Sequence, residues 1–129
     1  MITKEAVEAK ILRWMEAVSS GDLSVIDRAA DEFFTDDYVW HFPGLTGLQP
    51  GPAGVKSTFR AILAENPALK PTLDDLLVEG NKVATRCTLR RTDPDTGKPQ
   101  RCSDLVISRM VGDKTAEDWE LLGPWEDEP

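Results

Sequence analysis

The spacing of apolar residues changes near residue 70, from a helical repeat to the alternation that is typical of strands. Before this point, three segments carry apolar residues at the spacing of amphipathic helices, namely residues 3–21, 23–34 and 53–65. After it, four segments bounded by turn residues have strand patterns, namely residues 71–80, 82–92, 100–112 and 115–123. This order predicts an α+β fold, with helices packed on one face of a mostly antiparallel sheet.

The predicted helices have recognisable ends. Thr3 can cap the first helix, and Gly21 stands where that helix should stop. Asp22 can cap the second helix, and Pro52 suits the first turn of the third. These signals fix the boundaries of the helices independently of the apolar repeat.

A short predicted strand, "DDYVWHFPG" at residues 36–44, contains the only histidine of the chain, His41. Its neighbours Val39, Trp40 and Phe42 are apolar or aromatic. Histidine is the side chain whose ordinary pKa lies closest to neutral pH. His41 is therefore either a packed core residue or part of an active site, and the stretch alone leaves both readings open.

Composition narrows the classes of partner. The chain has 129 residues and a formal net charge of −8, without a cluster of Lys and Arg, which disfavours nucleic acid and anionic membranes as partners. We expect a single domain over residues 1–129, with an acidic, frayed tail at about 124–129. Cys87 and Cys102 suit reduced thiols in a cytoplasmic protein better than a disulfide or a metal site.

Alternation along the later strands sorts their side chains between the two faces of the predicted sheet. The strand patterns allow one face to collect charged residues, namely Arg86, Asp104, Asp118 and Glu120. The other face would be apolar, with Leu89, Leu105, Ile107, Trp119 and Leu121. An apolar outer face predicts a subunit interface. The same parity places Cys87 and Cys102 on opposite faces.

Three stretches together resemble a known family. They are "FFTDDYVWHFPG", "GVKSTFRAILAENPALKPTLDDLLVEGNKVATRCTLRRT" and "GKPQRCSDLVISRMVGDKTAEDW". In order and spacing they are similar to the SnoaL-like polyketide cyclases of the nuclear transport factor 2-like superfamily, over about residues 5–122. The resemblance implies a cone-shaped α+β barrel, in which helices and a curved sheet enclose a cavity for a small hydrophobic molecule. It also implies a homodimer, formed through the outer sheet face.

The resemblance implies roles for four residues. His41 stands where ketosteroid isomerase-like members keep their carboxylate base and where SnoaL-like cyclases often have His. Glu120 stands where cyclases and limonene epoxide hydrolase-like members keep an acid/base aspartate. Arg86 matches the arginine that lies between two acids in the epoxide hydrolases, and Asp118 replaces the His of an "EHW"-like motif. These four are the candidate catalytic residues.

Further positions define the expected pocket and two departures from the family. Thr88 stands where the epoxide hydrolases need an acid, and Val106 stands where the isomerases keep the acid of their oxyanion hole. Asp104 lies one step along the same face as Val106 and is a candidate substitute. Trp40 and Trp14 complete the expected pocket.

The chemistry expected from these residues is proton transfer without a metal or organic cofactor. A cyclase or isomerase removes a proton beside a carbonyl and stabilises the enolate, which needs a base and a hydrogen-bond donor. Two alternatives stay open: a non-catalytic module that binds a small ligand or dimerises, and an epoxide hydrolase. Fold alone does not separate them.

Overall fold

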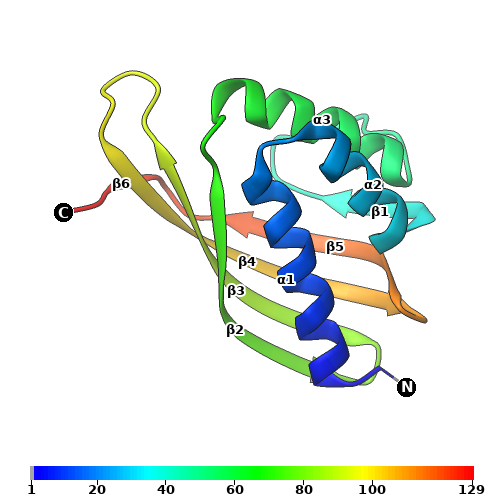
Figure 1. The fold of residues 1–129 in the computed structure, drawn as a ribbon. Helices are drawn as coiled ribbons and strands as arrows, with labels where there is room; N and C mark the ends of the chain where they lie inside the picture. The colour runs from blue at the N-terminus through cyan, green and yellow to red at the C-terminus, as the bar shows by residue number, and fades with distance from the viewer. Residues whose placement is uncertain (1) are drawn as a thin grey trace.

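The computed structural model describes residues 2–129 and consists of helices packed on one open sheet (Figure 1). The helices are α1 (Lys4–Ser20), α2 (Leu23–Phe33) and α3 (Pro52–Glu65). The strands are β1 (Phe34–His41), β2 (Lys70–Glu79), β3 (Lys82–Thr92), β4 (Pro99–Val111), β5 (Lys114–Leu122) and β6 (Glu126–Asp127). The prediction of an α+β fold with three helices on a mostly antiparallel sheet is confirmed.

The sheet has the order β1-β5-β4-β3-β2, and the short β6 pairs with β4. β1 is parallel to β5, whereas the other neighbours are antiparallel. Figure 1 shows the strands curving around the helices, which lie on one side of the sheet. One face of the sheet is therefore covered by helices, and we call it the inner face; the other is the outer face.

The helices begin and end where the sequence predicts. Thr3 Oγ1 accepts a hydrogen bond from the Ala6 amide at 3.1 Å, and Gly21 ends α1 in the left-handed conformation. Asp22 caps α2 by accepting from the amide of Ser24 at 2.9 Å. Among residues 2–129, no helix combines the length and the apolar character needed to span a membrane.

A glycine-rich loop connects β1 to α3 and returns along β1. Gly51 has a φ of 80°, and its amide donates to the carbonyl oxygen of Tyr38 at 2.8 Å. A β-carbon at this position would overlap the backbone of Asp36, so the close approach requires glycine. The loop thereby fixes the backbone of β1 at Tyr38.

The register of β3 and β4 corrects the predicted faces. Arg86 pairs with Leu105, and Cys87 pairs with Asp104. Directly paired residues share a face, so Cys87 accompanies Asp104 on the inner face and Arg86 does not. The predicted grouping of Arg86 with the acids was wrong. Cys102 is also buried on the inner face, because it lies two residues before Asp104.

The expected fraying of the C-terminal tail was also wrong. Gln100 of β4 pairs with Asp127 of β6, and Glu128 forms an ion pair with Arg90 at 3.0 Å. The guanidinium of Arg91 lies 4.2 Å from the centre of the Trp125 ring. These contacts hold residues 125–128 against the sheet, as Figure 1 shows for β6 beside β4.

Candidate functional site

A cavity of about 360 Å³ lies between the helices and the inner face of the sheet. Its volume falls in the range of small-molecule pockets. Most of its lining is apolar, and eight of the side chains are aromatic: Trp14, Phe33, Phe34, Tyr38, Trp40, Phe42, Phe59 and Trp125. Such a lining suits a flat, hydrophobic ligand.

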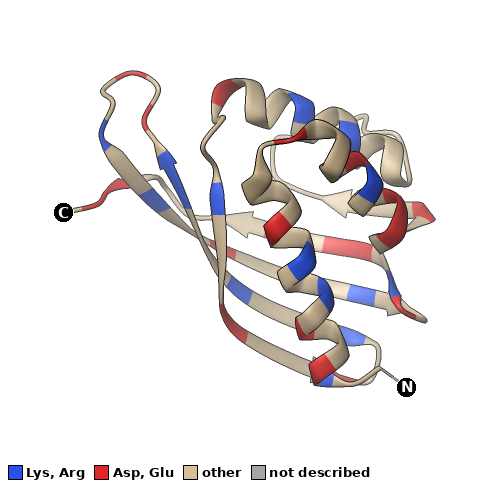
Figure 2. Cartoon of the chain, viewed as in Figure 1, with Lys and Arg blue, Asp and Glu red and all other residues tan. Residues whose placement is uncertain are grey.

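Three carboxyl groups point into this cavity from β4 and β5: Asp104, Asp118 and Glu120, which we call the acid cluster. Figure 2 shows acidic residues along β5, among the otherwise mixed charges of the sheet. Asp118 and Glu120 share the inner face because they are two residues apart on one strand. Val106 pairs directly with Glu120, which makes Asp104 a diagonal neighbour of Glu120 on the same face.

Asp118 is held by a tyrosine hydroxyl. The Tyr38 hydroxyl donates to Asp118 Oδ2 at 2.6 Å, and Ser108 stands directly opposite Asp118 on the neighbouring strand. The other oxygen, Oδ1, is buried and has no hydrogen-bond partner among the described residues. Burial raises the pKa of Asp118 to about 6, although the nearby hydroxyls of Ser108 and Tyr38 oppose this rise. Asp118 is therefore mostly ionised at neutral pH, yet more basic than an ordinary aspartate.

Glu120 and Asp104 are neighbouring carboxyls, and their interaction lowers the pKa of Asp104 and raises that of Glu120. Burial raises the pKa of both groups, that of Glu120 well above its ordinary value. Two adjacent buried carboxyls hold one proton between them, because ionising both costs too much. The indole Nε1 of Trp40 donates to Glu120 Oε1 at 2.8 Å and fixes the orientation of the pair.

The lining of the cavity also includes a lysine, Lys10. Lys10 reaches from α1 and donates to Thr115 Oγ1 at 3.0 Å. Burial lowers the pKa of Lys10 to about 8, while the negative charge of Asp118 opposes this effect. The cavity thus combines a carboxylate base, a proton-holding pair and an ammonium group in apolar surroundings.

Six of the nine predicted site residues line this cavity, namely Trp14, Trp40, Asp104, Val106, Asp118 and Glu120. The remaining three do not.

His41 lies on the outer face, so the expectation that it borders the cavity was wrong. Its ring stacks on Trp119, with centroids 5.3 Å apart, and its Nε2 lies 2.7 Å from Glu117 Oε2. The side chain is 46% exposed. Strand alternation explains the outcome, because Trp40 points inward and its immediate neighbour must then point outward.

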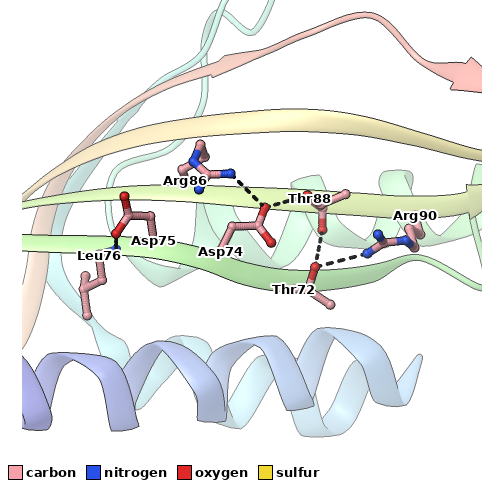
Figure 3. A network of polar contacts seen from close by, with 7 residues as sticks. All are labelled: Thr72, Asp74, Asp75, Leu76, Arg86, Thr88 and Arg90. Carbon is pink, nitrogen blue, oxygen red and sulfur yellow. Dashed lines mark hydrogen bonds and ion pairs between the residues drawn. The ribbon is translucent and has the colours of Figure 1, made fainter.

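Arg86 and Thr88 also lie on the outer face, in a polar network of β2 and β3 (Figure 3). Arg86 Nη1 is 3.8 Å from Asp74 Oδ2, and the Thr88 hydroxyl donates to the same oxygen at 2.6 Å. Arg90 extends the network by donating to Thr72 at 3.2 Å. These contacts are solvent-exposed surface interactions, and neither Arg86 nor Thr88 reaches the cavity.

Sequence reasoning missed three residues of the site: Lys10, Tyr38 and Ser108. Tyr38 stands two residues before Trp40 and must share its face. Lys10 lies three residues after Val7 and four before Trp14, which are both cavity residues. Ser108 lies two residues after Val106 on β4. Each could have been found by extending the alternation or the helical repeat from a residue already chosen.

Comparison with known proteins places the chain in a family. The family model for the SnoaL-like domain matches residues 11–118. Among curated proteins, none matches the sequence significantly.

Several solved structures share the fold. IdmH from Streptomyces antibioticus, a candidate polyketide cyclase, is 29% identical, with 90% of this chain and 91% of IdmH covered at a TM-score of 0.74. A candidate polyketide cyclase from Acidithiobacillus ferrooxidans is 20% identical, with 95% and 91% covered at a TM-score of 0.80. TsrD from Streptomyces laurentii is 22% identical, with 95% and 91% covered at 0.77. With the family model matching most of its length, this chain belongs to the SnoaL-like domain family.

Proposed function

We propose that this protein catalyses proton transfer on a small hydrophobic carbonyl compound, as a polyketide cyclase or isomerase that needs no cofactor. The observation that carries the proposal is the acid cluster, one buried and two half-buried carboxyls with raised pKa values on one side of an aromatic cavity. Carboxyls whose pKa values are pushed apart by their surroundings are typical of acid–base sites. Family membership and the likeness to IdmH support the same reading.

Asp118 is the proposed base. Its Oδ1 has no hydrogen-bond partner among the described residues, while Tyr38 holds Oδ2. A pKa of about 6 leaves the carboxylate ionised at neutral pH and matched to proton abstraction. Asp118 would take the proton from the carbon beside the substrate carbonyl, and the electron pair of that C–H bond would move into the enolate.

The Asp104–Glu120 pair is the proposed acid. The pair retains a proton at neutral pH because burial disfavours ionisation of both groups. Glu120, oriented by Trp40, would return this proton to the substrate after the enolate has rearranged or attacked a second carbonyl. Isomerisation and aldol-type cyclisation share these proton transfers and differ in the substrate.

The outer face supports a second proposal, that two copies of the chain pair through it. Ile107 pairs with Trp119 and Leu105 pairs with Leu121, so four large apolar side chains adjoin one another. All four are exposed, with Leu121 at 61%. A contiguous apolar patch on a sheet is typical of an interface. Leu89, which was expected in this patch, lines the cavity instead.

The apolar lining also suits a non-catalytic protein that only binds a small ligand. The two functions are separated by whether bound ligand exchanges protons. Epoxide hydrolysis receives no support from the geometry, because Arg86 and Thr88 lie on the outer face.

Deuterium exchange tests the enzymatic proposal. A panel of cyclic ketones and β-diketones is incubated with protein in heavy water, and loss of the proton beside the carbonyl is followed by NMR. We expect Asp118→Asn to slow exchange at least about a hundredfold, the lower range for removal of a general base. Asp74→Asn is the matched control, because Asp74 lies in the outer-face network of Figure 3.

Two outcomes would count against the enzyme. Exchange by Asp118→Asn at the rate of the unmodified protein would remove the base from the proposal. If no ketone exchanges while apolar ligands quench the tryptophan fluorescence, the protein is a ligand carrier.

A further inference from the structure

Lys10 is a positively charged group in a cavity that is otherwise apolar or acidic. Among the described residues that line the cavity, it carries the only positive charge. It is presented by α1 on the same side as Val7 and Trp14, which also line the cavity. Its ammonium nitrogen lies over the Phe33 ring, 5.8 Å from the ring centroid. The ammonium group is therefore directed into the ligand space by packing.

The ammonium is anchored by a single hydrogen bond. Lys10 Nζ donates to Thr115 Oγ1 at 3.0 Å, and the Thr115 hydroxyl lies 3.5 Å from Met110 Sδ. An ammonium has three N–H donors, so two remain available. Within residues 2–129, no carboxylate oxygen lies within 4.0 Å of Nζ. Besides its cation–π contact with Phe33, the half-buried ammonium can therefore donate to a ligand in the cavity.

The proposed reaction needs a hydrogen-bond donor to the substrate oxygen, and Lys10 can supply it. Enolate formation places negative charge on the substrate oxygen, and a donor directed at this oxygen lowers the barrier. Tyr38 and Trp40 already donate to the acid cluster. Val106, beside Glu120, has no donor to give.

We propose that Lys10 binds the carbonyl oxygen of the substrate and stabilises the oxyanion that forms when Asp118 takes the neighbouring proton. This inference rests on the proposed function and deepens it. The electron pair of the broken C–H bond ends on the oxygen held by Lys10, and the proton resides on Asp118, so the step balances without an oxidant or reductant. The substrate class is a hydrophobic ketone whose oxygen lies at the Thr115 end of the cavity.

The attraction between Lys10 and Asp118 supports this placement. Each charge favours the ionised form of the other, although the two groups are not in contact. A ketone oxygen inserted beside the ammonium would lie near the carboxylate that removes its α-proton. The base and the oxyanion donor then come from different elements, β5 and α1.

A phenol serves as a stable mimic of the enolate. Para-nitrophenol is titrated into the protein, and absorbance reports the ionised and neutral forms of the bound dye. We expect Lys10→Met to weaken binding of the phenolate about ten- to hundredfold, the loss typical for a hydrogen bond to a charged group. Lys10→Gln keeps a neutral donor, so its affinity for the phenolate should lie between those of Lys10→Met and the unmodified protein.

Two controls isolate the charge. Para-nitroanisole cannot ionise, and its affinity should be the same in Lys10→Met and the unmodified protein. Lys4→Met removes an exposed lysine from the same helix and should leave both ligands unaffected. Thermal melting of each variant confirms that it is folded.

The inference is overturned if Lys10→Met binds the phenolate as tightly as the unmodified protein, if it weakens both ligands equally, or if the unmodified protein binds no phenolate. Asp118→Asn separates this result from the enzymatic proposal. It should slow ketone exchange at least about a hundredfold yet retain phenolate binding, because Lys10 is intact. Lys10-dependent phenolate binding without any ketone exchange would refute the enzyme and leave the oxyanion site standing.

Discussion

Replacing Asp118 with asparagine should stabilise the protein at pH 8, although the same change removes the proposed base. Asp118 is half-buried in the cavity wall, and its removal from water raises its pKa from 3.8 to about 6. An ionised carboxylate in such a place costs folding free energy that a neutral amide does not. Tyr38 can still donate to the amide oxygen of the variant, so the hydrogen bond at that position is kept.

The pKa values set the size and the pH range of the effect. A rise of about two pKa units corresponds to about 3 kcal/mol at ~1.4 kcal/mol per unit. Because the folded-state pKa of Asp118 is the higher one, the native state binds more protons than the unfolded state. The stability that the folded state gains by binding this proton on Asp118 is complete below pH 3.8 and is lost as the pH rises through about 6.

Urea denaturation followed by tryptophan fluorescence measures the effect at pH 4 and pH 8. The advantage of Asp118→Asn over the unmodified protein should be about 2 kcal/mol larger at pH 8 than at pH 4. Comparing the two pH values cancels any effect of the substitution that does not depend on charge. Asp74→Asn, on the outer face, should show little difference between them. An equal change in stability at both pH values would refute the reasoning.

Three further predictions concern the site and the outer face. Tyr38→Phe removes a donor to Asp118 and should raise the pKa of Asp118. The acidic limb of the pH profile of the ketone exchange rate should then move to higher pH by about one unit. An unmoved limb would contradict the assignment of Asp118 as the base. Trp40→Phe removes the donor to Glu120, so the pKa of Glu120 should rise and the alkaline limb should move to higher pH in the same assay. If two copies pair through the outer face, Leu105→Glu should convert a dimer into a monomer in light scattering, with ketone exchange retained. A monomeric unmodified protein would exclude the pairing.

Much of the fold follows from local patterns. The caps at Thr3 and Asp22 and the change of periodicity near residue 70 are properties of short segments, and the structure keeps them. The C-terminal tail was wrongly predicted to be frayed, because the contact of Trp125 with Arg91 joins parts of the chain that are distant in sequence. Such a contact has no counterpart in the composition of the tail itself.

The site was harder to predict because strand alternation gives two faces without saying how the faces of different strands correspond. The acids of β5 were grouped correctly by their own spacing. Arg86 was added by assuming a register with β4 that differs by one residue from the real one. A shift of one residue moves every side chain of a strand to the other face. His41 was placed at the cavity by the family resemblance; because Trp40, its neighbour on β1, faces the cavity, His41 must point to the other side.

The parallel pairing of β1 with β5 has a consequence for the synthesis of the protein. Tyr38 and Trp40 meet Asp118 and Glu120 across 80 residues of chain. While a ribosome is still making the middle of the protein, these donors have no acceptors, and one edge of both β1 and β4 awaits β5. Long-range pairing of this kind is slow and leaves strand edges open to other chains. The emergence of β5 therefore both closes the sheet and creates the acid–base pairings, so a newly made chain should acquire its ligand site and its resistance to aggregation at the same moment.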